Sequence, residues 1–213
     1  MHLLALHGVP TSPALFERLP LELGAPQLRG TLSEQVAMVE PLVHPDTVLL
    51  GHDMGGVVAA MVALRCRPRA LVLSGTALGP YWDLVRLTAL PGLAGFFYRK
   101  YGGRRFVAGA VAPARAAEAL AAFPGADPDE MRRIAASMRP PRGLGRSLRG
   151  LPVALVWGRR DRWYPPAVGA AVARGTRATI HWVEAGHFAP WEAPAAYADA
   201  LVTGVRGLGV GVR

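Results

Sequence analysis

The sequence predicts an α/β fold, in which a mostly parallel sheet of about six strands carries helices on both faces. Three observations predict it. Short apolar runs typical of buried strands alternate with helical runs from 1 to 76. The alternation stops from 77 to 150, where stretches punctuated by proline and glycine show no strand pattern, and it resumes from 151 to 213. We therefore expect a core formed by 1–76 and 151–213, with a helical cap inserted at 77–150.

The first part of the chain begins with an apolar run, HLLALH, that predicts a buried strand. Thr31 followed by Glu34 has the pattern of a capping box and predicts the start of a helix, which Pro41 ends or kinks. The expected elements are, in order, a strand at 2–7, a helix at 14–23, a weak strand or loop at 24–30, a helix at 31–43, a strand at 46–51, a helix at 54–65 and a strand at 69–75.

The inserted block predicts helices, and the last part of the chain returns to strands. Asp127 is a candidate helix N-cap because Pro128 follows it at the first helical position. The run RPPRG at 139–143 predicts a linker. The expected elements are helices at 113–123 and 127–138, then a strand at 152–158, a helix at 166–174, a strand at 178–184 and a helix at 193–206.

The composition excludes several classes of protein. The net charge is +9, but Lys100 is the only lysine, the arginines are scattered and no nucleic-acid-binding motif is present. The longest apolar runs are far too short to span a bilayer, and the N-terminus has no signal-peptide pattern. The single Cys66 cannot form an internal disulfide. We therefore expect a cytoplasmic protein with a small-molecule substrate and no membrane or nucleic-acid partner.

The run LLGHDMGGVV at 49–58 predicts a strand, a very tight turn and a helix, with Asp53 at the tip of the turn. Three flanking glycines would let the strand and the helix approach closely. This is the pattern of a nucleophile elbow, whose central residue adopts an unfavourable backbone conformation. Asp53 could also simply cap the helix that begins at Met54.

Two later residues complete a candidate catalytic triad. Asp161 follows the strand at 152–158, and His187 follows the strand at 178–184. The chain order is therefore nucleophile, acid and histidine. Both late residues lie on loops at strand ends, where side chains from separate strands can converge.

Four motifs in this order resemble the α/β-hydrolase superfamily, and the resemblance covers nearly the whole chain. The elbow, G-H-D-x-G-G, is similar to that of the branch containing epoxide hydrolases, haloalkane dehalogenases and fluoroacetate dehalogenases. The resemblance implies an α/β-hydrolase fold, a triad of Asp53, Asp161 and His187, and an oxyanion hole formed by the backbone N–H groups of Val9 and Met54. The motifs are HGVP at 7–10, GHDMGG at 51–56, GRRDRWYP at 158–165 and GHFAPWEAP at 186–194.

An aspartate nucleophile suits a particular chemistry. Asp53 is ionised at neutral pH without a base and can attack an sp3 carbon that bears a leaving group or belongs to a strained ring. The product is an alkyl ester of Asp53, whereas attack on an ordinary ester would give a mixed anhydride. His187 would then deprotonate a water that attacks this ester, with Asp161 orienting the imidazole. Neither step needs a cofactor.

Some positions depart from the family patterns. Haloalkane dehalogenases usually have Trp where this chain has Met54 and often Asn where it has Val9, and epoxide hydrolases often share that Trp. Fluoroacetate dehalogenases usually have Arg after the nucleophile. The H-G-x-P motif is more similar to epoxide hydrolases, whose cap tyrosines protonate the opening epoxide. Candidate halide-binding residues are Trp82 and Trp163, and candidate cap proton donors are Tyr81, Tyr98 and Tyr101.

Other polar residues have weaker claims to a role in the site. Asp83 is an alternative triad acid, although Asp161 fits the motif better. His7 and His52 are expected to make structural hydrogen bonds, and the remaining histidines lack the spacing of a metal site. The short spacing between the first motif and Asp53 indicates a reduced sheet, or an exposed sheet edge that a partner such as a second copy in a homodimer would cover.

Two other classes of function remain open from the sequence. An esterase, lyase or isomerase on the same scaffold could use Asp53 as a base or leave it as a bystander. A non-catalytic small-molecule binder could also occupy a reduced hydrolase scaffold, because the fold alone does not choose among them.

Overall fold

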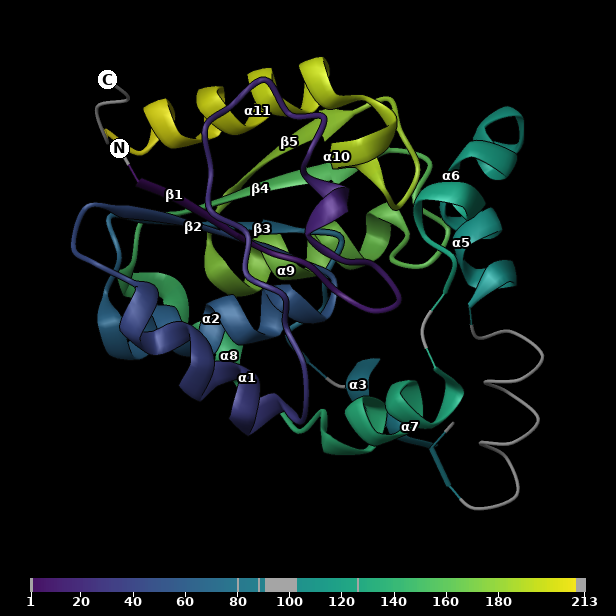
Figure 1. The fold of residues 1–213 in the computed structure, drawn as a ribbon. Helices are drawn as coiled ribbons and strands as arrows, with labels where there is room; N and C mark the ends of the chain where they lie inside the picture. The colour runs from purple at the N-terminus through teal and green to yellow at the C-terminus, as the bar shows by residue number, and fades with distance from the viewer. Residues whose placement is uncertain (1, 80, 88, 91–102, 126, 210–213) are drawn as a thin grey trace.

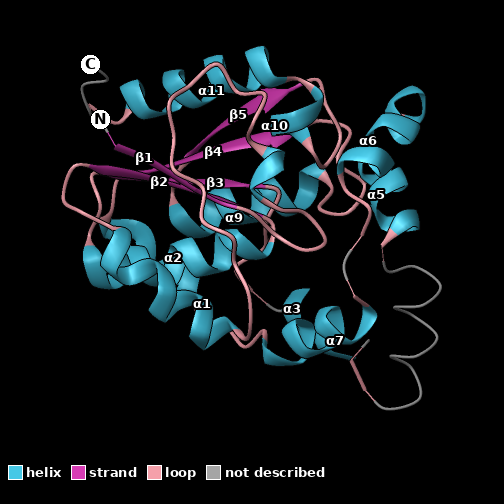
Figure 2. Ribbon diagram, in the orientation of Figure 1, coloured by secondary structure: helices cyan, strands magenta, loops and turns pink. Residues whose placement is uncertain are grey.

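The computed structural model describes residues 2–79, 81–87, 89–90, 103–125 and 127–209. Five strands form one parallel sheet, and their order in the sheet follows their order in the chain. Figure 2 shows this sheet between layers of helices, which confirms the predicted α/β class. The strands are β1 (His2–Leu6), β2 (Thr47–His52), β3 (Ala70–Ser74), β4 (Val153–Gly158) and β5 (Thr179–Val183).

The described residues form five strands rather than about six. The segment at 24–30, expected as a weak strand or loop, makes only one isolated bridge, between Leu4 and Gly24. The backbone N–H of Gly24 donates to Leu3 O at 2.9 Å, but Pro26 two residues later has no N–H to continue the ladder. The segment therefore contacts β1 without extending the sheet.

The sequential strand order decides which helices cover each face. Crossovers between parallel strands share one handedness, so connections that always step in the same direction place their helices on one face. In Figure 1, α1 (Leu32–Val39) and α2 (Met54–Cys66) lie below the sheet, and α9 (Pro166–Thr176) packs in the same apolar cluster as α2. The opposite face is covered by the C-terminal α11 (Pro194–Gly207), which packs in a second cluster with the short α10 (Ala189–Glu192).

Local signals placed some helix boundaries correctly and one helix wrongly. The capping box forms as predicted, because Thr31 N–H donates to Glu34 Oε2 at 2.7 Å and Glu34 N–H donates back to Thr31 Oγ1 at 3.4 Å. Pro41 lies in the 3₁₀ turn η2 (Glu40–Leu42) that follows α1. The helix expected at 14–23 is wrong: only the 3₁₀ turn η1 (Pro13–Leu15) forms there. Pro20 could not continue a helix through this segment.

Helices occupy the chain between β3 and β4, with no strand among the residues described there. Asp127 caps α7, accepting the N–H of Asp129 at 2.7 Å. Figure 1 places α3, α5, α6 and α7 at the side toward which the strands point. The division into core and cap stays a prediction. The elements are α3 (Tyr81–Leu87), α5 (Arg104–Ala110), η3 (Pro113–Arg115), α6 (Ala116–Ala122), α7 (Pro128–Ser137), α8 (Leu144–Ser147) and η4 (Leu148–Gly150).

No helix in the described part of the chain combines the length and apolar character needed to cross a membrane. Two of the three candidate cap tyrosines, Tyr98 and Tyr101, lie outside the described residues.

Candidate active site

The turn between β2 and α2 has the strained backbone predicted for a nucleophile elbow. Asp53 has φ 52° and ψ −124°, a conformation that side-chain-bearing residues rarely adopt and that costs roughly 1–3 kcal/mol. Its backbone is held in place by two bonds: Asp53 N–H donates to Ser74 O at 3.0 Å, and Gly56 N–H donates to Asp53 O at 3.0 Å. The Asp53 side chain makes no helix-capping hydrogen bond. The turn therefore presents the carboxylate rather than using it to begin α2.

Close packing explains the glycine that follows the elbow. A Cβ at Gly55 would lie 2.4 Å from the backbone oxygen of Leu6 and 2.5 Å from that of His7. Both contacts are with the backbone of β1 and its following loop, which cannot move away as a flexible side chain could. Gly55 thus lets α2 start directly against the loop that carries the first motif.

Gly55→Ala is expected to lower the free energy of unfolding by about 1–3 kcal/mol, because the added methyl group overpacks against that backbone. Chemical denaturation followed by circular dichroism would measure the change. Gly175→Ala is the matched control, since its Cβ would meet nothing within 4 Å and alanine is the better helix former in α9. Equal stability of the two variants would contradict the close approach.

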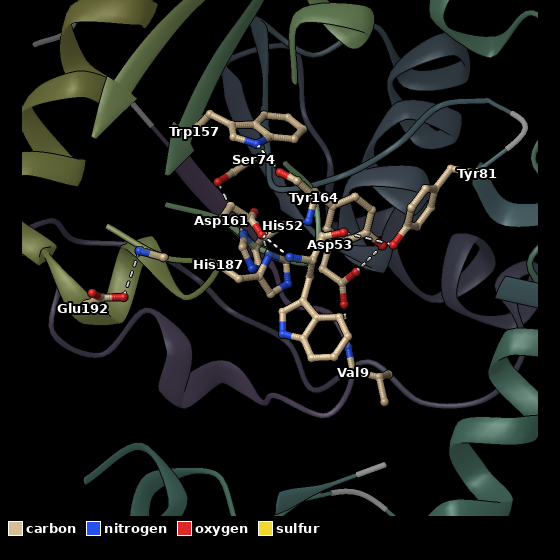
Figure 3. A network of polar contacts seen from close by, with 12 residues as sticks. Val9, His52, Asp53, Ser74, Tyr81, Trp157, Asp161, Tyr164, His187 and Glu192 are labelled. Atoms are coloured by element: carbon tan, nitrogen blue, oxygen red, sulfur yellow. Dashed lines mark hydrogen bonds and ion pairs between the residues drawn. The ribbon is translucent and has the colours of Figure 1, made fainter. Parts of the chain in front are cut away.

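The first motif supplies a donor to the Asp53 carboxylate. Val9 N–H donates to Asp53 Oδ2 at 3.2 Å (Figure 3). The loop passes so close to the carboxylate that a Cβ at Gly8 would lie 2.1 Å from Oδ2. The backbone N–H groups of Met54 and Val9 also help to lower the pKa of Asp53. These are the two donors that the sequence predicted for an oxyanion hole, and the structure brings both to the carboxylate.

The structure also joins Asp161 and His187. His187 Nδ1 lies 2.9 Å from Asp161 Oδ2, and both side chains are buried (Figure 3). The other carboxylate oxygen, Oδ1, accepts the backbone N–H groups of Trp163 at 2.9 Å and Tyr164 at 2.8 Å. Since a carboxylate only accepts, Nδ1 carries the proton of this pair and Nε2 is left with its lone pair.

The lone pair of His187 Nε2 has no partner within the described residues and is buried. The His187 ring lies face to face with Tyr164, with centroids 5.3 Å apart, and its centroid is 4.7 Å from that of His52. A buried imidazole nitrogen without a partner is costly unless another molecule uses it. This atom is therefore free to accept a proton from a bound water or substrate.

Burial and charge act in opposite directions on the two titrating groups. Burial raises the pKa of Asp53, although His187, the Tyr164 hydroxyl and the two backbone donors work against that rise. Burial lowers the pKa of His187, but the charge and hydrogen bond of Asp161 and the charge of Asp53 outweigh it, so the net shift is upward. The mutual influence of Asp53 and His187 means that the nucleophile candidate and the base candidate share one electrostatic site.

The histidine loop is tied to the inserted helices. His187 N–H donates to Ala110 O, the last residue of α5, at 2.7 Å. Glu192 accepts the N–H of Gly186 at 2.9 Å through Oε2 and that of Ala112 at 3.4 Å through Oε1. Glu192 therefore links the histidine loop to the segment that follows α5, a role consistent with its place in the histidine motif.

Several predicted side chains lie apart from this arrangement. Asp83 is exposed on α3 and pairs with Arg86 at 2.9 Å, so it does not replace Asp161. Trp82 Nε1–H donates to Ala77 O and is not available to a halide, whereas Trp163 Nε1 is buried with no partner in the described part of the chain. Tyr81, the one candidate cap donor within the described residues, donates its hydroxyl to Trp163 O at 3.0 Å.

The two motif histidines make the structural contacts expected of them. His7 Nδ1 lies 2.7 Å from Gly8 O, and His7 Nε2 accepts Leu28 N–H at 3.0 Å. His52 Nδ1 lies 3.3 Å from Ser74 Oγ, and burial holds the pKa of His52 well below its usual range. No cluster of potential metal ligands occurs among the described residues.

One residue of the site was missed by the sequence analysis. Tyr164 donates its hydroxyl to Asp53 Oδ1 at 2.7 Å, a contact between residues 111 positions apart (Figure 3). The signal in the sequence is its place three residues after Asp161 on the same loop, outside the inserted block that contains the three candidate cap tyrosines.

Comparisons with known proteins concern the family and the fold. A model described as "Alpha/beta hydrolase family" matches residues 3–200. A search of the curated proteins finds no match. Among solved structures the chain is similar to a thermophilic esterase from Thermogutta terrifontis, at 22% identity and a TM-score of 0.73, over 98% of this chain and 90% of that one.

Two further solved structures have the same fold. A bromoperoxidase from Bacillus anthracis is 13% identical with a TM-score of 0.72, covering 96% of this chain and 92% of that one. A haloalkane dehalogenase from Bradyrhizobium elkani is 18% identical with a TM-score of 0.68, covering 98% and 90%. At these identities the likeness shows the fold alone.

Proposed function

The chain belongs to the α/β-hydrolase family, and from that premise we propose that it hydrolyses a small, mainly apolar electrophile, an epoxide or a haloalkane, with Asp53 as covalent nucleophile. The observation that carries the proposal is the Asp53 carboxylate at the strained tip of the elbow, within 3.2 Å of a backbone donor and in the field of a buried histidine–aspartate pair. A serine in that position would need His187 before it could attack, but a carboxylate does not.

In the first step, a carboxylate oxygen of Asp53 attacks an sp3 carbon of the substrate. A carbon–oxygen bond forms, and the bond to the leaving group breaks with its electron pair. The product is an alkyl ester of Asp53. The aromatic rings around His187, Phe106 at 6.0 Å and Phe188 at 5.6 Å between centroids, suit an apolar substrate and help to exclude bulk water.

In the second step, His187 Nε2 takes a proton from a water that attacks the carbonyl carbon of the ester. Asp161 holds the imidazole by its Nδ1–H and stabilises the positive charge that develops on the ring. The backbone N–H groups of Val9 and Met54 stabilise the tetrahedral oxyanion. One such donor is typically worth roughly 3–4 kcal/mol of the barrier. Collapse of the intermediate releases the alcohol and restores Asp53.

Replacing His187 by Gln is expected to stop the reaction at the ester, because alkylation of Asp53 needs no base whereas hydrolysis does. The variant would be incubated with short-chain terminal epoxides and bromoalkanes, then analysed by intact mass and peptide mapping. We expect a stable adduct on the peptide that contains Asp53, which the wild-type protein does not accumulate.

His181→Gln is the matched control, since His181 lies on β5 and outside the site. It should turn over the same probes without accumulating an adduct. An unmodified His187→Gln protein, or an adduct on another peptide, would count against Asp53 as the nucleophile.

A further inference from the structure

The fold gathers arginines from two separate parts of the chain at one cavity. Arg86 lies on α3, Arg139 and Arg142 lie on the connection between α7 and α8, and Arg146 lies on α8. All four line a cavity of about 460 Å³. The packing of α3 beside α7, which Figure 1 shows, places Arg86 in the same cavity as the other three. A cavity of this volume is large enough for a small organic molecule.

The lining of this cavity carries positive charge that the described part of the protein does not neutralise. The chain from 131 to 160 contains eight arginines and no Asp or Glu. Arg86 pairs with Asp83 at 2.9 Å, and Asp83 also lines the cavity. The other three arginines form no ion pair with any described residue. Four positive charges and one negative charge therefore leave the described lining with a net charge of +3.

The backbone around these arginines is restricted before any ligand binds. Pro140 and Pro141 lie between Arg139 and Arg142 and line the cavity with them. Each proline ring fixes one φ angle, so the connection loses little conformational freedom on binding. The two guanidinium groups are thus presented by a backbone that is already largely ordered.

A buried aromatic side chain supplies an apolar part of the lining. Trp82 is 2% exposed, and its Nε1–H donates to Ala77 O, which holds the ring in place. The same ring lies 6.2 Å from that of Tyr164, which donates to Asp53 in the candidate active site. Neither Asp53 nor His187 lines the cavity. The cavity is therefore a neighbour of the candidate active site and not a part of it.

The number of guanidinium groups favours a phosphate over a carboxylate as the bound group. A guanidinium stays charged in proteins, and its planar fork of N–H groups binds either anion with two hydrogen bonds. One arginine is enough for the two oxygens of a carboxylate, whereas the three terminal oxygens of a phosphomonoester accept hydrogen bonds from several arginines. A phosphomonoester also carries a charge of about −1.5 to −2 at pH 7, which matches the lining better than a single negative charge.

We infer that the cavity lined by Arg86, Arg139, Arg142 and Arg146 binds the phosphate group of a small phosphorylated organic molecule, whose organic part packs against Trp82. The same phosphomonoester group occurs in soluble compounds and in the headgroup of phosphatidic acid, so the experiment includes a probe for each source. The inference does not rest on Asp53 being a nucleophile, and it adds a binding site to the hydrolysis proposed above.

Isothermal titration calorimetry with phenyl phosphate at low ionic strength tests the inference, with benzoate as the probe that carries a carboxylate instead. We expect phenyl phosphate to bind at least ~10-fold more tightly than benzoate, and its affinity to fall as salt is added, because salt screens the arginines. Combining Arg142→Gln with Arg146→Gln should weaken phenyl phosphate binding at least ~10-fold, the effect of losing a charge-assisted hydrogen bond. Both arginines are exposed, so the variant should fold as the wild type does.

The matched variant combines Arg69→Gln with Arg206→Gln, which removes the same charge from two exposed arginines that do not line the cavity. It should bind phenyl phosphate as the wild type does. Equal affinities in the two double variants, whether lowered in both or unchanged in both, would overturn the inference.

Sedimentation with phosphatidylcholine vesicles, with and without phosphatidic acid, tests the lipid source. Binding that requires phosphatidic acid and is lost in the Arg142→Gln, Arg146→Gln protein, without binding of phenyl phosphate, would identify a lipid headgroup as the ligand. A wild-type protein that binds neither phenyl phosphate nor phosphatidic acid would refute the site. None of these outcomes changes the standing of Asp53, because no arm of the experiment measures hydrolysis.

Discussion

Replacing Asp53 by Ala is expected to abolish turnover of epoxides and haloalkanes, with kcat reduced by roughly 10⁴–10⁶, as for the loss of other covalent nucleophiles. No other carboxylate in the described part of the chain is placed to take over. Asp161 is held by His187 and by two backbone N–H groups, and Asp83 is exposed on α3. Steady-state product formation would measure the loss, and thermal unfolding would show that the variant is folded.

Asp83→Ala is the matched control, because it removes an exposed carboxylate that forms an ion pair with Arg86. Its turnover should match the wild type. Turnover that survives Asp53→Ala would contradict a nucleophilic role for Asp53 and favour an esterase, lyase or isomerase that uses another catalytic group. A wild-type protein that binds these compounds tightly without converting them would instead be a small-molecule binder.

Replacing Asp161 by Asn is expected to slow hydrolysis of the Asp53 ester by about 10⁴, while its formation continues. The reason is the tautomer of His187. Asp161 Oδ1 accepts two backbone N–H groups, so the amide oxygen of Asn must occupy that place and its NH₂ must face His187 Nδ1. The amide then donates to Nδ1, the ring proton moves to Nε2, and the base is lost.

The same variant should shift the pH dependence of its residual activity. In the wild type the ester hydrolyses only when His187 is neutral, so the rate falls as the pH drops through the pKa of His187, which lies above its ordinary value of about 6.5. Asp161→Asn removes the charge that raises this pKa. The fall in rate should therefore occur at lower pH, as measured by single-turnover decay of the adduct.

Two results would contradict this role for Asp161. One is a fall in the rate of ester hydrolysis at higher pH than in the wild type, and the other is a variant in which no adduct accumulates at steady state. Asp199→Asn serves as the control for a carboxylate-to-amide change, because Asp199 is exposed on α11. Its profile should follow that of the wild type.

Patterns within short stretches predicted much of the molecule. The capping box at Thr31, the N-cap at Asp127 and the elbow at Asp53 formed where the sequence placed them, since each depends on neighbours a few residues away. The helix expected at 14–23 did not form for an equally local reason, because Pro20 could not continue it. The short segment at 24–30 joined the sheet only as a bridge, because pairing depends on a partner strand as well as on local sequence.

By itself, the amino-acid sequence determined the alternation of strands and helices, the strained turn at Asp53 and the order of Asp53, Asp161 and His187 along the chain. Only the tertiary structure decided how many strands pair in the described residues, that Asp161 accepts the proton of His187 Nδ1, and that Tyr164 rather than Tyr81 donates to Asp53. The physical reason is range: a turn or a cap is set by bonds between near neighbours. A hydrogen bond across 111 residues exists only once two loops have packed at the same edge of the sheet.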